Sequence, residues 1–202
     1  MSQRKHRKYG RNVKFSKIIV CKQGCCKVQI EPFTWKKEWT SSENNTEKKA
    51  GIFIYDSLSS KILLVQSCGF LWGPPKGSVK KNETIQDAAI REVKEETGID
   101  ITPEQLEKVH NLKKKSYYYT LDMRECPVDI KNNKNNDANG ITWIKIGCLT
   151  TLCNNKGTYK MTRHAKIMIK RVFGMDIINK SHSMPLLKII PDTIKKEMNI
   201  KV

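Results

Sequence analysis

Several features are scarce in this sequence, and each scarcity excludes a class of protein. No apolar run approaches the roughly 20 residues that a membrane-spanning helix needs, and the first residues lack the apolar core of a signal peptide. No internal repeat is present, which excludes an architecture of stacked repeats. We therefore expect an intracellular, cytoplasmic protein that does not enter a membrane, with one core of the size that 202 residues can bury.

A regular disulfide framework is also missing. The cysteines are odd in number and irregular in spacing, so we interpret them as reduced thiols. The segment Cys21–Cys26 holds three of them and could bind zinc, but no second cysteine or histidine pair follows at the spacing of a zinc finger. A zinc site is therefore not predicted. The seven cysteines are Cys21, Cys25, Cys26, Cys68, Cys126, Cys148 and Cys153.

Acidic residues are few compared with basic ones. The chain has 20 Asp and Glu against 38 Lys and Arg, which gives a formal charge of +18. This excess favours an anionic partner such as nucleic acid, a polyphosphate or a membrane surface. The first seventeen residues are basic and have almost no apolar periodicity, so they are predicted to form an arm and not a packed element.

The apolar pattern of the remaining chain predicts a mixed sheet with two helices. The spacing favours a helix over 84–97, with Asn82 or Thr84 as its cap and Gly98 as its stop, and a second helix over 161–173. The glycines and prolines of 70–77 favour an ordered loop. Alternating and β-branched runs predict strands at 17–21, 51–55, 61–66, 106–112, 115–123 and 140–146, of which 51–55 and 61–66 form an antiparallel pair.

The helix over 84–97 carries an unusual concentration of negative charge. Glu92, Glu95 and Glu96 lie at positions i, i+3 and i+4, so their carboxylates project from one face, which we expect to face solvent. Three like charges repel one another there, unless a hard divalent cation such as magnesium or manganese takes the carboxylate oxygens. Neutralisation by neighbouring lysines on a solvated face is the alternative.

The residues around this cluster resemble the Nudix box, G-x5-E-x7-R-E-U-x-E-E-x-G-U, in which U is aliphatic. Nine specified positions at fixed spacing rarely coincide by chance. The positions are filled by Gly77, Glu83, Arg91, Glu92, Val93, Glu95, Glu96, Gly98 and Ile99.

The resemblance implies hydrolysis of a nucleoside diphosphate linked to another group, on an α/β/α sandwich with a mixed β-sheet. It implies Mg²⁺ or Mn²⁺ as cofactor, with Glu92, Glu95 and Glu96 as catalytic metal ligands and the Gly77 carbonyl as a further ligand. Glu83 and Arg91 match the supporting pair of the family. We accordingly divide the chain into a basic N-terminal arm with a partly ordered lead-in (1–49), a Nudix hydrolase domain (50–173) and a C-terminal extension (174–202).

Within the superfamily, the loop before the box looks most like that of messenger-RNA decapping enzymes of a minimal or viral type. Their Trp-Gly-x-Pro-Lys-Gly stretch matches residues 72–77, although Pro74 fits the Trp-x-Pro-Pro-Lys-Gly stretch of diadenosine tetraphosphate hydrolases equally well. Asp137, six residues before Trp143, matches an additional acidic base or metal ligand of the decapping enzymes; a plain turn aspartate is the alternative.

These resemblances predict capped RNA as the substrate and 7-methylguanosine diphosphate as a product. Lys76 and one face of the second helix, with Arg163, Lys166 and Lys170, are the predicted RNA contacts. A diadenosine tetraphosphate hydrolase, an inositol pyrophosphate hydrolase and a non-catalytic RNA-binding protein remain as alternatives. The aromatic candidates for stacking on the methylated base are Trp35, Trp39 and Tyr117 to Tyr119.

Overall fold

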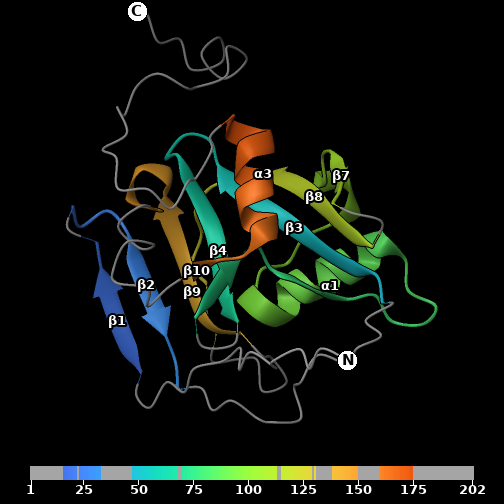
Figure 1. The fold of residues 1–202 in the computed structure, drawn as a ribbon, viewed down its shortest axis with the longest axis horizontal. Coiled ribbons are helices and arrows are strands. Elements are labelled where there is room, and N and C mark those ends of the chain that lie inside the picture. The colour runs from blue at the N-terminus through green and yellow to red at the C-terminus, as the bar shows by residue number, and fades with distance from the viewer. Residues whose placement is uncertain are drawn as a thin grey trace, which may run out of the picture.

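A mixed β-sheet forms the centre of the protein. The computed structural model describes residues 16–21, 23–32, 47–67, 70–112, 115–128, 130, 138–149 and 160–174. Within these ranges the main strand order is β1-β2-β9-β4-β3-β8-β7, with β5, β6 and β10 attached to it (Figure 1). The strands are β1 (Lys17–Val20), β2 (Lys27–Ile30), β3 (Lys49–Asp56), β4 (Lys61–Ser67), β5 (Leu71–Gly73), β6 (Lys76–Ser78), β7 (Val109–Asn111), β8 (Ser116–Asp122), β9 (Ala138–Lys145) and β10 (Lys160–Met161). The helices are α1 (Ile85–Thr97), α3 (Arg163–Phe173) and the 3₁₀ helices η2 (Pro103–Gln105) and η3 (Ile146–Cys148).

Helices α1 and α3 cover opposite faces of the sheet. Successive side chains of a strand point to opposite faces. Ile52 of β3 accordingly packs in the core cluster that contains Val93 of α1, whereas the neighbouring Phe53 packs in the cluster that contains Met168 of α3. In Figure 1, α3 crosses in front of the sheet. The expected α/β/α sandwich with a mixed sheet is therefore confirmed, and β3 pairs antiparallel with β4 but parallel with β8.

Both expected helices form, α1 with Thr84 as its cap and α3 from Arg163, two residues after the expected start. The Thr84 hydroxyl accepts a hydrogen bond from the Asp87 backbone N–H at the start of α1, and Gly98 ends the helix with φ of 76°. Helix α3 has the same pattern, with Thr162 as its N-cap and Gly174 in the left-handed conformation with φ of 67°. Among the residues that the structure describes, no helix is long and apolar enough to span a membrane.

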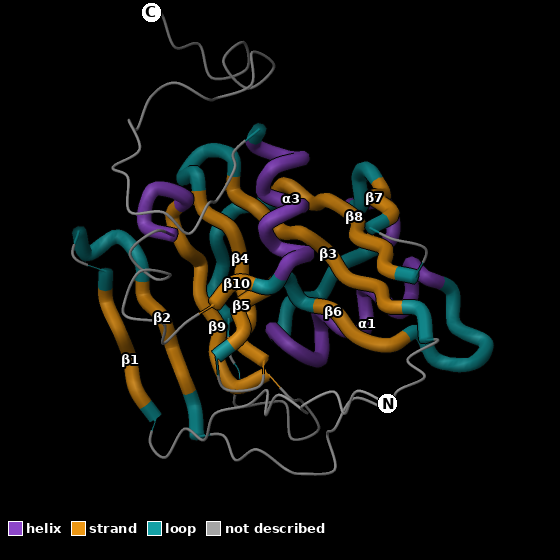
Figure 2. The backbone as a smooth tube through the Cα atoms, viewed as in Figure 1, coloured by secondary structure: helices purple, strands orange, loops and turns teal. Residues whose placement is uncertain are grey.

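The sheet begins earlier in the chain than the expected start of the core near residue 50. The predicted strand at 17–21 is confirmed as β1, which pairs with the unpredicted β2, and β2 pairs in turn with β9. Figure 2 shows this hairpin at one edge of the sheet and β7 at the other. The division at residue 49 stays a prediction, but two strands of the lead-in belong to the sheet. The extension from residue 175 onward lies outside the described residues.

Candidate active site

The three glutamates of α1 gather beside β6, but they differ in exposure. The side chain of Glu95 is 46% exposed and that of Glu92 is 13% exposed, whereas Glu96 is 2% exposed. The expectation of a solvent-facing trio is therefore wrong for Glu96. The reason is that α1 packs against β6, which covers the helix on the side of Glu96.

The loop before α1 is held by direct contacts to two of these carboxylates. The backbone N–H of Lys76 donates to Glu96 Oε2 at 2.9 Å, so the buried charge has a hydrogen-bond donor. At Gly77, a Cβ atom would lie 2.0 Å from the carboxyl carbon of Glu92. A side chain at position 77 would therefore displace the Glu92 carboxylate, which occupies that space. The half-buried Lys76, a predicted substrate contact, lies in the same strand.

Arg91 connects the loop to the carboxylates with all three nitrogens of its guanidinium. Its Nε and Nη2 donate to the Glu83 carboxylate at 2.7 and 3.0 Å, and Nη2 also donates to the Ser78 carbonyl at 2.9 Å. Its Nη1 donates to Glu92 at 2.7 Å and to Glu95 at 3.0 Å. Hydrogen bonding to Arg91 lowers the pKa of Glu83, and the same bonds raise the pKa of Arg91. The two residues predicted as a supporting pair thus hold the ends of the loop and helix together.

The N-terminus of α3 is attached to the same loop. Strand β10 pairs in parallel with β5, and the Thr162 backbone N–H donates to the Trp72 carbonyl at 2.7 Å. A Cβ atom on Gly73 would lie 2.7 Å from Thr162 Oγ1, so the helix cap packs directly on the loop backbone. The loop that carries Lys76 and Gly77 therefore sets the position of the start of α3.

Tyr118 lies between α3 and the glutamates, a connection that the sequence did not predict. The Tyr118 hydroxyl lies 3.1 Å from His164 Nδ1, and the two rings meet edge to face at 5.5 Å. Burial raises the pKa of Tyr118, and the negative charge of Glu96 raises it further. His164 and Tyr118 are 46 residues apart, and no spacing in the sequence indicates that they meet.

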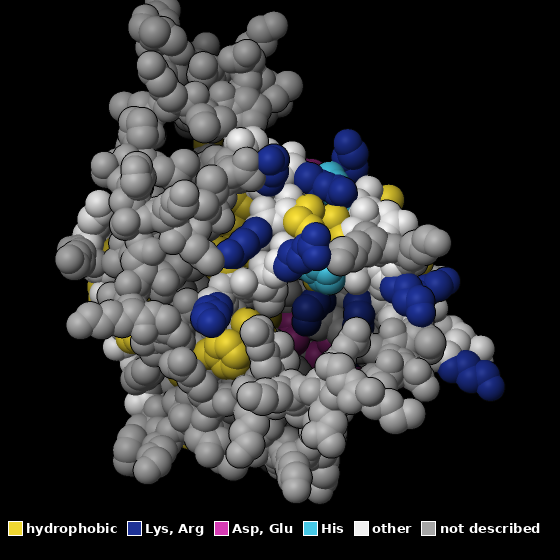
Figure 3. All heavy atoms as spheres, in the orientation of Figure 1, with side chains coloured by type: hydrophobic (Ala, Val, Ile, Leu, Met, Phe, Trp, Pro, Cys, Tyr) yellow, Lys and Arg dark blue, Asp and Glu magenta, His cyan; other side chains and the backbone are white. Residues whose placement is uncertain are grey.

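The predicted basic residues of α3 lie together on one side of the helix, next to its buried stripe. Arg163 and Lys170 are exposed and Lys166 is half-buried. In the view of Figure 3, acidic side chains lie in a hollow, and Lys, Arg and His side chains lie next to them along one side of it. The surface beside the hollow is therefore suited to a polyanion whose reacting end reaches the carboxylates.

Some predicted residues are not brought into this site by the described structure. Tyr118 is fully buried and so cannot stack on a base, whereas Tyr117 and Tyr119 are half-buried. Asp137, Trp35 and Trp39 lie outside the described residues, and their predicted roles stay predictions.

The donor set of the site fits a hard divalent cation. The three carboxylates lie on one helical face, where Glu92 and Glu95 share the Nη1 of Arg91, and Gly77 leaves open the space in which the Glu92 carboxylate lies. Carboxylate and carbonyl oxygens are the ligands that Mg²⁺ and Mn²⁺ prefer. Arg91 orients Glu92 and Glu95 from one side, as a positioning group does around a metal site.

Three known proteins are similar in sequence to this chain over stretches of different length. The protein called hydrolase 111R in Invertebrate iridescent virus 3 is 31% identical over 139 residues, which are 67% of this chain and 81% of that protein. The m7GpppN-mRNA hydrolase of Saccharomyces cerevisiae is 37% identical over 84 residues, 37% of this chain but 9% of that protein. The asymmetrical bis(5'-nucleosyl)-tetraphosphatase of Caenorhabditis elegans is 49% identical over 63 residues, 29% of this chain and 44% of that protein.

The family to which these similarities point is also found by comparison with family profiles. The NUDIX domain matches residues 46–165, which include the whole of α1, the loop before it and the start of α3. The region contains Gly77, Glu83, Arg91 and the three glutamates in the geometry described above. Because the match spans more than half of the chain, this protein belongs to the NUDIX domain family.

Proposed function

We propose that this chain is a cytoplasmic messenger-RNA decapping enzyme that uses Mg²⁺ or Mn²⁺. The reaction hydrolyses the phosphoanhydride bridge of the 5′ cap, and it releases 7-methylguanosine diphosphate and RNA with a 5′-monophosphate. One observation carries the proposal: the loop that contacts Glu92 and Glu96 also holds the start of α3, whose exposed face is basic. A site for phosphate cleavage and a surface for the RNA body are thereby fixed relative to each other.

The residues of the site have separate tasks in this reaction. Glu92, Glu95 and Glu96 would hold the ion, which when bound screens the charge of the phosphate bridge and lowers the pKa of water. Glu95 is the most exposed of the three and so is the one best placed to meet water or substrate. Arg91 and Glu83 position the carboxylates, and Lys76, whose backbone N–H donates to Glu96, is the proposed cation for the bridge.

The basic face of α3 would hold the RNA beyond the cap. A dinucleotide substrate needs only local cations, whereas an RNA contacts cations with many successive phosphates. Arg163, Lys166 and Lys170 extend along the helix from the end that Trp72 holds. The similarity to the yeast m7GpppN-mRNA hydrolase supports this substrate.

Hydrolysis of diadenosine tetraphosphate is the second candidate. Pro74 and Pro75 fit the loop of such hydrolases, and the nematode tetraphosphatase is 49% identical over the matched residues. An inositol pyrophosphate would also match the cationic surroundings. A purely RNA-binding protein is a weaker alternative, because binding alone does not require three carboxylates on one helical face.

The test compares capped RNA, diadenosine tetraphosphate and an inositol pyrophosphate as substrates with Mg²⁺ and with Mn²⁺. We expect 7-methylguanosine diphosphate from capped RNA, identified by chromatography, and release at least about 100-fold slower by the Glu95→Gln variant. Rapid production of ATP and AMP from diadenosine tetraphosphate without any 7-methylguanosine diphosphate would contradict decapping. RNA binding without hydrolysis of any of the three would favour the non-catalytic alternative.

A further inference from the structure

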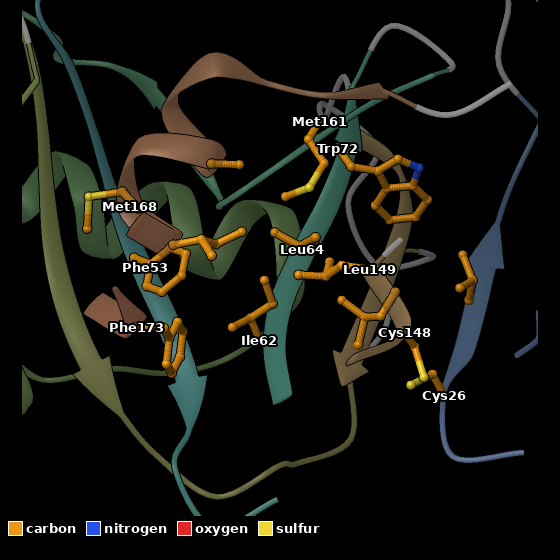
Figure 4. Close-up of a cluster of buried hydrophobic side chains, with 14 of the residues drawn as sticks. Cys26, Phe53, Ile62, Leu64, Trp72, Cys148, Leu149, Met161, Met168 and Phe173 are labelled. Carbon is orange, nitrogen blue, oxygen red and sulfur yellow. The ribbon is translucent and has the colours of Figure 1, made fainter. Parts of the chain in front are cut away.

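Four cysteines from two distant parts of the chain meet at the edge of the sheet near β1 and β2. Cys21, Cys25 and Cys26 lie in the turn between these strands, and Cys148 lies at the end of η3 after β9. All four sulfur atoms lie within 4.8 Å of one another. In Figure 4 the side chains of Cys26 and Cys148 point toward each other.

The distances between the sulfur atoms are those of ligands around a single ion. The Cys25 sulfur lies 3.5 Å from each of the sulfurs of Cys21, Cys26 and Cys148, and the Cys148 and Cys21 sulfurs are 3.9 Å apart. Four sulfurs bound tetrahedrally at about 2.3 Å from zinc lie about 3.8 Å from one another. A disulfide would bring two of them to about 2.05 Å, but these four cysteines are free thiols.

We propose that Cys21, Cys25, Cys26 and Cys148 bind one Zn²⁺ ion in a closed structural site. Four thiolates complete the tetrahedral coordination of zinc and leave no position for a substrate. The site is thus separate from the glutamates of α1, and its role is in folding and not in hydrolysis.

The backbone around the cluster supports bound thiolates. The Lys145 backbone N–H donates to Cys26 Sγ at 3.1 Å, and Gly24, with φ of 71°, closes the turn through a bond from its N–H to the Cys21 carbonyl at 2.9 Å. Donors of this kind orient metal ligands and stabilise their charged form.

Such a site would fasten the β1–β2 hairpin to the rest of the sheet. The hairpin precedes residue 46, where the NUDIX domain match begins, and each of its strands has four residues. Ile18 and Val20 of β1 are 58% and 57% exposed, so the outer strand buries little apolar surface that could hold it in place. Zinc bound between the turn and Cys148 would stabilise the hairpin, since metal binding free energy is gained only in the folded state.

The sequence did not predict this site because its fourth ligand does not follow finger spacing. Cys25 and Cys148 are 123 residues apart, and only the pairing of β2 with β9 brings them together. Cys68 and Cys153 lie outside the described residues.

The test measures zinc in the full chain, produced with zinc in the medium and purified under reducing conditions without a histidine tag. We expect about one zinc per chain by mass spectrometry of the metal. Replacement by Co²⁺ should give the thiolate-to-cobalt charge-transfer absorption and the intense visible bands of a tetrahedral thiolate site. Cys148→Ser should lose most of the zinc and lower the melting temperature. The control is Cys126→Ser, which removes a half-buried thiol from the opposite core cluster. It should keep the zinc content and the melting temperature of the wild type.

Two further measurements keep the proposal testable if Cys148→Ser does not fold. Removal of zinc from the unaltered chain by a chelator should lower its melting temperature, and added zinc should restore it. Glu95→Gln should retain the zinc, which separates this site from the carboxylates. A reduced wild-type chain that contains no zinc and shows no cobalt–thiolate absorption would overturn the proposal. Loss of zinc from Glu95→Gln but not from Cys148→Ser would do the same.

Discussion

At the residue scale, the exposure of the three glutamates separates catalytic from structural effects. Glu95 is half-exposed, and its hydrogen bond from Arg91 is one of several that Arg91 makes. Glu95→Gln should therefore leave the fold intact and remove a charge needed for the ion. We expect kcat to fall about 100-fold or more, as when one strong electrostatic stabiliser is lost. Steady-state kinetics and a thermal melt of the same preparation measure both effects.

The matched control is Glu104→Gln, which removes an exposed carboxylate from η2 and should leave kcat unchanged. Glu96→Gln should differ from Glu95→Gln and from Glu104→Gln in its effect on stability. Its carboxylate is buried and accepts the Lys76 backbone N–H, so both melting temperature and kcat should decrease. Turnover of Glu95→Gln within fivefold of the wild type would show that the carboxylates of α1 do not bind a catalytic ion.

Gly77 provides a test of the geometry that does not depend on activity. An alanine Cβ would lie 2.0 Å from the Glu92 carboxyl carbon, so Gly77→Ala must displace that side chain or the loop. We expect the free energy of unfolding to decrease by about 1–3 kcal/mol, the usual cost of overpacking a tight contact. Chemical denaturation of the wild type and the variant gives this difference.

The double variant Gly77→Ala with Glu92→Ala identifies the cause. If the clash with Glu92 is responsible, Gly77→Ala should cost little in a chain that already has alanine at position 92. An equal cost in both backgrounds would place the strain elsewhere in β6.

At the scale of elements, α3 is the candidate RNA surface. Replacing Arg163, Lys166 and Lys170 by glutamine should weaken binding of capped RNA and reduce its salt dependence. For three lost phosphate contacts the slope of log K against log salt should decrease by about 2. Hydrolysis of a small phosphoanhydride substrate should be retained, because the buried face of α3 is unchanged.

The control for the helix is glutamine at Lys27, Lys108 and Lys115, three exposed lysines in or beside β2, β7 and β8. This variant has the same net charge as the α3 variant. Equal losses of affinity in the two would show that total charge, and not the face of α3, determines RNA binding.

The elements also show which parts of the structure could be predicted from the sequence. Helix α1 was predicted because its apolar spacing, the Thr84 cap and Gly98 agree locally. Strands β5 and β10 were not, since they have three and two residues and exist through pairing with other strands, β5 with β4 and β10 with β5. Contacts between distant residues, such as that of Tyr118 with His164, depend on the sheet order, which no local pattern specifies.

In the candidate site, too, the features of one continuous stretch were predicted and those that depend on distant contacts were not. The Nudix-box residues were predicted because the motif lies in one continuous stretch, and Arg91 and Glu83 meet across eight residues. The burial of Glu96 was not predicted, because helical periodicity places carboxylates on a face without showing what covers that face. The cysteine cluster was not predicted, because Cys148 comes close to the other three cysteines only when β1, β2 and β9 are paired.

At the scale of the whole molecule, the formal charge of +18 fits a substrate longer than the cap itself. If α3 holds the RNA body, kcat/KM for capped RNA should rise with RNA length and level off once the chain passes α3. The eleven residues of this helix span about 16 Å. A free cap dinucleotide should be a poor substrate, because it lacks the contacts that position the bridge.

The α3 glutamine variant should remove this length dependence while the Lys27, Lys108 and Lys115 variant keeps it, because only the former lacks the cations beside the loop at Trp72. Initial rates of 7-methylguanosine diphosphate release over a series of capped RNAs measure the effect at matched concentration. A tetraphosphatase should instead cleave diadenosine tetraphosphate rapidly and treat short and long capped substrates alike. A flat length series for the wild type would therefore contradict the proposal that α3 binds the RNA body.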